Sequence, residues 1–132
     1  MSDPLRGVHP DLASRVRRVL AGMAALGESM RVIEGVRTKE RQQALYAQGR
    51  TTPGKIVTYA DGVTKRSFHQ VADDGYGYAV DCAFENDPRT PRDETWAEDR
   101  PWAAYGALAE AVGLTWGGRW KMRDLPHVEW RP

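Results

Sequence analysis

Apolar residues recur at helical spacing in two stretches of the chain. Within residues 12–26, leucine, valine and methionine return every three or four positions. This spacing predicts a helix that opens at His9-Pro10-Asp11 and ends before Gly27. A second stretch has the same spacing from Trp102 to Val112, and Asp99 is its expected N-cap.

Shorter apolar runs predict β-strands between these helices. β-Branched and aromatic residues concentrate in four runs, at Met30–Gly35, Tyr78–Phe84, Leu114–Trp116 and His127–Trp130. Ile56–Tyr59 predicts a further short strand inside a turn-rich segment, residues 50–66. The alternation of helices with short strands that can pair antiparallel predicts a compact α+β domain.

The polar segments complete this outline. Thr38 is expected to cap a third helix from Lys39 to about Gln48. Residues 85–99 are expected to form a long surface loop, and Gly117-Gly118 a hairpin-like turn. We expect one domain over residues 1–132, a small antiparallel sheet flanked by helices, with no separate binding domain.

Composition adds limits on where the chain folds and acts. It has 132 residues, of which 41% are hydrophobic and 28% charged, as in ordinary globular domains. The single Cys82 excludes an internal disulfide. No apolar run approaches the roughly 20 residues that span a bilayer. The first residues lack the apolar core of a signal peptide, so we expect synthesis in the cytoplasm without one.

Charge is distributed unevenly along the chain. Residues 1–66 contain twelve Lys and Arg against six Asp and Glu, whereas residues 67–132 contain seven against twelve. The basic half is either a solvated face or a surface that attracts an anionic polymer. Nucleic acid is not the expected polymer, because only Tyr46 and Tyr59 in that half could stack on bases.

The candidate chemistry lies in two segments far apart in the sequence. Asp81 is embedded in the apolar run of residues 78–84, where an unpaired carboxylate is costly. His69 precedes it and His127 lies near the end of the chain; with Asp81 they could supply the three protein ligands of a catalytic zinc site. Asp124, three positions before His127, could then take a proton from water.

The motifs around these residues resemble the zinc-dependent peptidoglycan peptidases of the M15 family, and most of all the phage L-alanyl-D-glutamate endopeptidases (endolysins). The resemblance extends over nearly the whole chain from residue 10. It rests on these motifs: Gly35-Val36-Arg37-Thr38, Leu45-Tyr46-Ala47-Gln48-Gly49-Arg50, Ser67-x-His69, Gly77-Tyr78-Ala79-Val80-Asp81, Gly113-Leu114-Thr115-Trp116-Gly117-Gly118 and Asp124-Leu125-Pro126-His127.

The resemblance implies a role for each matching residue. It implies one zinc ion on His69, Asp81 and His127, with Asp124 as the general base. Arg37 would hold the substrate or the developing oxyanion, and the other expected substrate-binding residues are Ser67, Gln43 and Trp116. Trp116, Trp120 and Trp130 could wall the cleft, with core packing expected for at least one of them.

The sequence departs from the family in the spacing of two ligands. Asp81 follows His69 by twelve positions, which is longer than the family's usual gap. Residues 71–75 are therefore expected to bulge out of the ligand hairpin. Asp73 or Asp74 is a rival ligand, although both look more like solvent-facing residues of the loop tip.

The expected function is hydrolysis of an amide bond in the peptidoglycan stem peptide, foremost L-Ala-D-Glu, by a monomeric lytic enzyme. The alternatives are a D,D-carboxypeptidase of the same family and a non-catalytic zinc module that binds the cell wall. Action on the wall in the periplasm would require release from the cytoplasm, for which a holin is a candidate partner. No membrane partner is expected.

Overall fold

A computed structural model describes residues 3–86 and 95–132. Its helices are α1 (Pro10–Ala25), α2 (Lys39–Ala47) and α3 (Trp102–Ala111), with a 3-10 helix η1 (Gly117–Arg119). Its strands are β1 (Met30–Glu34), β2 (Ala79–Phe84), β3 (Thr115–Trp116) and β4 (His127–Glu129). The strands form one antiparallel sheet in the order β1-β2-β4-β3. The predicted α+β class is confirmed.

The central strand β2 separates the core from the functional face of the sheet. Side chains alternate between the two faces of a strand. Val80, Cys82 and Phe84 are fully buried members of the hydrophobic core. Asp81 lies between them in the sequence and therefore points to the opposite face. A carboxylate thus stands in an apolar strand without entering the core.

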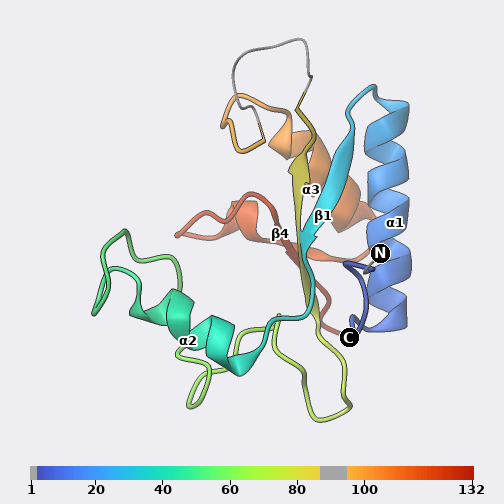
Figure 1. Cartoon of the computed structure of the whole chain (residues 1–132). Helices are drawn as coiled ribbons and strands as arrows, with labels where there is room; N and C mark the ends of the chain where they lie inside the picture. The colour runs from blue at the N-terminus through green and yellow to red at the C-terminus, as the bar shows by residue number, and fades with distance from the viewer. Residues whose placement is uncertain (1–2, 87–94) are drawn as a thin grey trace.

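Helices α1 and α3 supply the other wall of that core. Leu12, Val16 and Met23 of α1 and Tyr105 and Ala109 of α3 have at most 1% of their surface exposed. Figure 1 shows α1 and α3 close to the strands of the sheet, with α2 apart from both helices. Burial of these apolar side chains is the main source of stability in such a domain.

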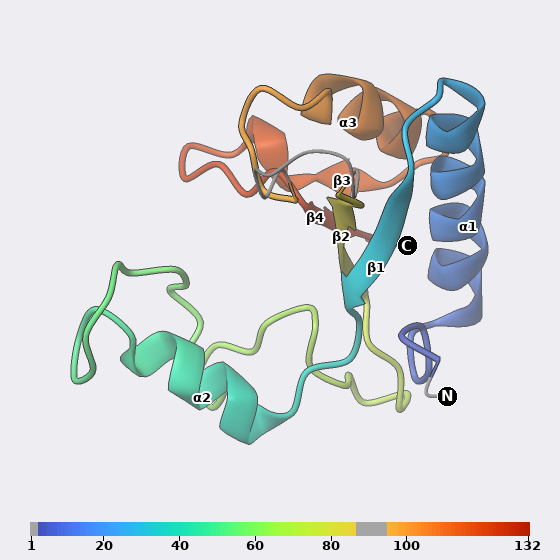
Figure 2. The same ribbon diagram turned by 45° about the horizontal axis from the view of Figure 1, so that its top comes forward.

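Residues 35–78 form a second region, which we call the arm. It comprises α2 and the loops on either side of it. Figure 2 shows α2 and these loops extending away from the sheet and from helices α1 and α3. Outside α2 the arm has little regular structure, and it is held by side-chain hydrogen bonds and by single backbone hydrogen bonds such as that from the Tyr78 N–H to the Phe68 carbonyl. It leaves Ile56, Val57 and Tyr59 exposed by 41–64%.

Three details of the predicted elements are wrong. Ile56–Tyr59 is not a strand, because the segment pairs with none of the strands in the described residues. Instead, the Thr58 hydroxyl accepts a hydrogen bond from the Gln42 amide. Asp99 does not cap α3. The helix begins at Trp102 after Pro101, since the residue before a proline avoids helical geometry.

The third detail is the glycine pair after β3. Gly117-Gly118 opens the 3-10 helix η1 instead of a tight hairpin turn. A Cβ atom on Gly118 would lie 2.2 Å from the Trp116 ring, so this glycine allows the indole to pack against the backbone. Within residues 3–86 and 95–132, no helix has the length and apolarity that crossing a membrane requires.

Candidate metal centre

The register of the sheet brings two of the predicted ligands together. In the antiparallel pair β2–β4, Asp81 lies directly opposite His127. Directly paired residues share a face of the sheet, with Cβ atoms roughly 5 Å apart. The His127 Nδ1 atom accordingly lies 3.2 Å from Asp81 Oδ1. Val128, the next residue, pairs with Val80 on the core face.

The third predicted ligand, His69, comes from the arm. Its Nε2 atom is 3.2 Å from the same oxygen, Asp81 Oδ1. The backbone N–H of Arg37 donates to the His69 carbonyl at 2.7 Å, which ties the His69 loop to the end of β1. His69, Asp81 and His127 each offer a ligand atom, and the three atoms lie within 4.8 Å of one another.

Hydrogen bonds fix which ring nitrogen of each histidine faces the centre. The His69 Nδ1–H donates to the Gly35 carbonyl at 2.8 Å, which leaves the lone pair on Nε2. The His127 Nε2–H donates to Glu129 Oε1 at 2.7 Å, and Arg131 holds the other carboxylate oxygen at 2.6 Å. Such outer partners orient metal-binding imidazoles and raise their basicity.

The inward-facing atoms fit a bound cation. His69 Nε2 and Asp81 Oδ1 are buried and, in the described part of the chain, are the side-chain polar atoms without a hydrogen-bond partner. Burying such atoms without a partner is costly. Two imidazole nitrogens and one carboxylate oxygen match the protein ligands of a catalytic zinc site that keeps a further position open. The residues therefore fit the metal that the sequence predicts.

The electrostatics of the three groups agree with that fit. Burial alone would raise the pKa of Asp81, but the nearby rings of His127 and His69 outweigh it and keep the carboxylate ionised. Burial likewise lowers the pKa of His127, while Asp81 and Glu129 raise it to about 9. A proton on this ring compensates the two carboxylates in the metal-free protein, and a metal ion would replace it.

Asp124 lies beside this cluster, at the mouth of the site. Its Oδ2 atom is 3.8 Å from His127 Nδ1, and its side chain is 45% exposed. Two backbone hydrogen bonds, from Asp124 to Gly117 and from His127 to Asp124, fold the segment back on itself. A Cβ at Gly117 would lie 2.5 Å from the Asp124 carbonyl oxygen, so glycine permits this approach. Burial and repulsion by Asp81 raise the pKa of Asp124.

Arg37 reaches the same site from the start of the arm. Its Nη2 atom is 3.7 Å from Asp81 Oδ2. Its Nε and Nη2 atoms bind the two oxygens of Glu34 at 2.9 Å each, and its Nη1 atom donates to Gln42 at 2.8 Å. The side chain is only 10% exposed. Arg37 therefore lies beside the predicted ligand Asp81 and is held by two residues that the sequence analysis did not single out, Glu34 and Gln42.

The glutamine beside Arg37 is Gln42, whereas the sequence analysis chose Gln43. Gln42 is fully buried, and its amide also donates to the Ala60 carbonyl at 2.7 Å. Gln43 is exposed. A substrate contact by Gln43 stays a prediction.

The remaining predicted residues differ in burial and in their distance from the site. Ser67 Oγ accepts a hydrogen bond from the His69 N–H at 3.2 Å, so it shapes the ligand loop. Trp116 is 9% exposed and donates to the Leu125 carbonyl, which gives it the core-packing role expected for at least one tryptophan. The Trp120 ring lies 4.9 Å from the His127 ring, beside the site. Trp130 instead packs against His9 and Tyr78.

The two rival aspartates lie outside the cluster. Asp73 is exposed and 3.6 Å from Arg66, and Asp74 is exposed and accepts a hydrogen bond from the Tyr76 N–H at 3.0 Å. The group of potential ligands found among the described residues contains Asp81 and neither of these two. Residues 71–76 are all exposed, as expected for a segment that bulges outward.

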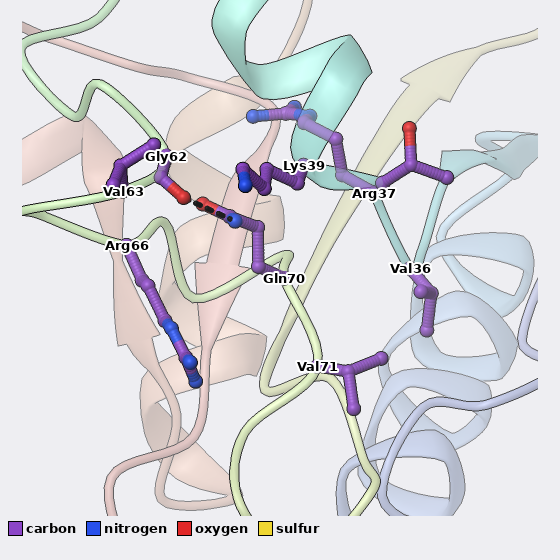
Figure 3. A pocket seen from close by; sticks show the side chains of 9 residues that line it. Val36, Arg37, Lys39, Gly62, Val63, Arg66, Gln70 and Val71 are labelled. Atoms are coloured by element: carbon purple, nitrogen blue, oxygen red, sulfur yellow. Dashed lines mark hydrogen bonds between the residues drawn. The ribbon is translucent and has the colours of Figure 1, made fainter.

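A cavity of about 380 Å³ lies within the arm, lined by residues 36–39 at the start of α2 and by residues of the 62–71 segment. Its charged lining residues are Arg37, Lys39 and Arg66, with no acidic residue among them. Figure 3 shows the Gln70 side chain beside Gly62 at this cavity, joined by a hydrogen bond of 3.1 Å. This bond links the His69 loop to the loop of residues 60–66.

The sequence analysis missed three residues that support the site: Glu34, Gln42 and Glu129. Glu129 could have been predicted from the sequence, because it is two positions from His127 on one strand and so lies on the same face. The position of Glu34 could not have been predicted, because it depends on an irregularity in the pairing of β1 with β2. The role of Gln42 could not have been predicted either, because its partners Thr58 and Ala60 lie in irregular structure.

The fold and the buried histidine–aspartate cluster define a small metal-dependent hydrolase, and comparison with known proteins gives its family. The family model for D-alanyl-D-alanine carboxypeptidases of the M15 peptidases matches residues 61–130. The chain is also 33% identical to the peptidoglycan L-alanyl-D-glutamate endopeptidase CwlK of Bacillus subtilis, with 95% of this chain and 74% of CwlK covered. The chain belongs to the M15 family of peptidases.

Solved structures show the same fold. The L-Ala D-Glu endopeptidase ChiX of Serratia marcescens superposes with a TM-score of 0.65 at 26% identity, and 97% of this chain and 84% of ChiX are covered. The LD-carboxypeptidase LdcB superposes with a TM-score of 0.62 at 18% identity, with 94% of this chain and 65% of LdcB covered. The predicted family and enzyme class are confirmed.

Proposed function

We propose that this chain is a zinc-dependent endopeptidase that hydrolyses the L-Ala-D-Glu amide bond of the peptidoglycan stem peptide and so acts as a cell-wall lytic enzyme. The observation that carries the proposal is the cluster of His69, Asp81 and His127 with the carboxylate of Asp124 beside it. The substrate follows from CwlK and ChiX, both of which are L-Ala-D-Glu endopeptidases.

Zinc on the three ligands would supply Lewis acidity, which makes water a nucleophile near neutral pH and polarises a carbonyl group. The chain's own residues then have to move protons and hold the substrate. Asp124 is suited to the first task, because its raised pKa lets its carboxylate both accept and return a proton. We assign it the proton of the attacking water and the transfer of that proton to the leaving amine.

Arg37 is suited to the second task. Its guanidinium lies beside Asp81 and is already oriented by Glu34 and Gln42. A donor that is fixed before the reaction stabilises developing negative charge better than a mobile one, typically by about 3–4 kcal/mol. We assign Arg37 to the oxygen of the scissile carbonyl, and Ser67 to a supporting position near the substrate.

Replacement of Asp124 tests the proposed base. The variant Asp124→Asn keeps the size of the side chain, and we expect it to bind zinc as wild type does. Turnover of purified peptidoglycan should fall by about 10²–10⁴-fold, since general base catalysis contributes that much. The matched control is Asp73→Asn, an identical change in an exposed loop, which should retain full activity. Normal activity of Asp124→Asn would remove Asp124 from the reaction.

The second candidate function is a D,D-carboxypeptidase, which the description of the matching family model favours. Both candidates use the same ligands, so the bond cleaved has to be identified directly. Mass spectrometry of muropeptides after digestion separates them. A newly freed L-Ala terminus supports the endopeptidase, whereas loss of a single terminal alanine supports the carboxypeptidase.

A zinc module that binds the cell wall without cleaving it is the alternative outside enzymes. Asp124 argues against it, because a binding module has no use for a proton acceptor beside a complete ligand set. Elemental analysis should find one zinc ion per chain, and zinc should restore the activity of protein treated with a chelator. Stoichiometric zinc combined with binding but no cleavage of peptidoglycan would favour the module.

A further inference from the structure

Glu34 stands beside the metal centre because of an irregularity in the sheet. In the pairing of β1 with β2, Val32 lies opposite Cys82, but Glu34 lies opposite Asp81. Two residues of β1 therefore span one residue of β2, which is the pattern of a β-bulge. In a regular ladder Ile33 would face Asp81. The bulge puts a carboxylate opposite the metal ligand in place of an apolar side chain.

Glu34 uses this position to bind Arg37 and not the metal ligands. Its two oxygens accept hydrogen bonds from Nε and Nη2 of Arg37 at 2.9 Å each. This is the bidentate arrangement in which arginine pairs most strongly with a carboxylate. Gln42 takes the remaining terminal nitrogen, Nη1, at 2.8 Å. Arg37 is thus held on both sides, with its side chain only 10% exposed.

The consequence concerns Asp81, the other carboxylate within reach of Arg37. Arg37 Nη2 comes to 3.7 Å from Asp81 Oδ2, while Asp81 Oδ1 faces both histidines. The Nε–Nη2 edge that could pair bidentately with Asp81 is already occupied by Glu34. An arginine free to rotate would compete with a metal ion for the Asp81 carboxylate, because both are cations that seek the same oxygens.

We propose that Glu34 is a positioning residue that holds Arg37 away from the metal ligand Asp81 while keeping its guanidinium at the site. The role of Gln42 is to seat the opposite side of the guanidinium. The inference rests on the proposed metal centre. It makes Glu34 part of the site, although the hydrogen bonds of its carboxylate go to Arg37 and to neither a histidine nor Asp124.

A double-mutant cycle on zinc affinity tests the proposal. Glu34→Gln keeps the side chain's size but loses the bidentate pair, so zinc affinity should fall by about 10–100-fold, as for other outer partners of metal ligands. Arg37→Met should change affinity little, because Glu34 already restrains and neutralises the guanidinium. The double variant should bind zinc nearly as tightly as Arg37→Met alone, and competition with a chelator measures all three.

The cycle distinguishes positioning from two simpler roles. If Glu34 acts only by its charge, Arg37→Met will raise affinity by the same factor with and without Glu34. If Glu34 only stabilises the fold, the double variant will bind zinc no better than Glu34→Gln. Either result overturns the proposal. Glu110→Gln is the matched control, since Glu110 and Arg119 form a similar bidentate pair on the exposed surface.

Nuclear magnetic resonance of the metal-free protein gives a readout that requires neither zinc nor catalysis. The Arg37 Nε–H should exchange slowly with solvent in the wild type and much faster in Glu34→Gln; equal exchange in the two proteins would overturn the proposal. If the wild type bound no metal at all, the proposed function would fail, and this measurement would still decide whether Glu34 holds Arg37.

Discussion

The two histidines of the site are held by regions of different construction. His127 lies on strand β4, where the sheet register sets it opposite Asp81, and its outer nitrogen binds the buried carboxylate of Glu129. His69 lies on a loop of the arm, and its outer nitrogen binds the Gly35 carbonyl. One predicted ligand is therefore fixed by backbone pairing, and the other by a set of individual hydrogen bonds.

This difference assigns separate tasks to the sheet and the arm. The sheet fixes Asp81 and His127 relative to one another through the same backbone hydrogen bonds that stabilise the fold. The arm brings His69 and Arg37, and its attachment relies on buried amide side chains such as Gln42 and Gln70. Irregular segments with few such bonds open locally at lower free energy than strands do. We therefore expect substitutions on the sheet side to destabilise the whole domain, and substitutions in the arm to increase local opening of the arm alone.

The largest expected effects come from removing each histidine in turn. His127→Ala and His69→Ala should both abolish stoichiometric zinc binding, because each removes a ligand. In the metal-free state His127→Ala should also lower the free energy of unfolding by about 3–5 kcal/mol, since it leaves buried carboxylates without their partner. His69→Ala should lower it by only about 1–3 kcal/mol, the usual effect of an unsatisfied carbonyl.

Urea denaturation of protein freed of metal by a chelator measures these differences. Elemental analysis of the untreated variants checks the loss of zinc. Equal destabilisation by the two substitutions would contradict the idea that the sheet and the arm hold their ligands differently.

The next effect is a pH dependence specific to the sheet side. In the metal-free protein Asp81 and Glu129 raise the pKa of His127 from 6.5 to about 9, against the effect of burial. The folded state therefore holds a proton that the unfolded chain releases above pH 6.5. This contribution is complete below pH 6.5 and disappears as the pH rises through about 9, with a loss on the order of 3 kcal/mol.

Thermal denaturation between pH 6 and pH 9.5 in the presence of a chelator measures this slope. The control is His127→Ala, which should flatten the curve over that interval. Stability of the wild type that stays constant or increases with pH in this range would show that His127 is not protonated between the two carboxylates.

The sequence predicted the residues of the sheet better than those of the arm. Asp81 and His127 lie in strands whose apolar alternation shows both the element and the face, so their positions follow from periodicity and pairing. His69 was a candidate ligand from its residue type and from the motif resemblance, and its geometry depends on contacts with residues far away in the chain. The register shift that brings Glu34 opposite Asp81 has no counterpart in the pattern of apolar residues.

The arm also contains the clearest errors of prediction. Ile56 and Val57 have β-branched side chains, and local propensity favours a strand there. In the described part of the chain, however, no strand pairs with this segment. Gln42 and Gln43 are adjacent glutamines on α2, and only the three-dimensional position of Ala60 makes one of them a buried connection. Propensity describes single residues, whereas these outcomes depend on tertiary partners.

The smallest expected effect comes from loosening the arm without touching a ligand. Gln70 accepts a hydrogen bond from the Ser67 N–H at 2.9 Å and donates one to the Gly62 carbonyl at 3.1 Å. Gln70→Met keeps the volume but leaves both partners unsatisfied, which should cost about 1–3 kcal/mol locally. Hydrogen exchange should speed up at residues 60–71 and remain unchanged in β2 and β4.

The zinc affinity of Gln70→Met should decrease only several-fold, because His69 is still present. Zinc binding can restore the order of the His69 loop, and the free energy of that ordering is subtracted from the binding free energy. Gln43→Met on the exposed surface of α2 is the control, and it should alter neither exchange nor affinity. Faster exchange in β2 and β4 of Gln70→Met would mean that the arm and the sheet unfold together. The two histidines would then belong to a single cooperative unit, and the separate construction of the two sides would have no energetic consequence.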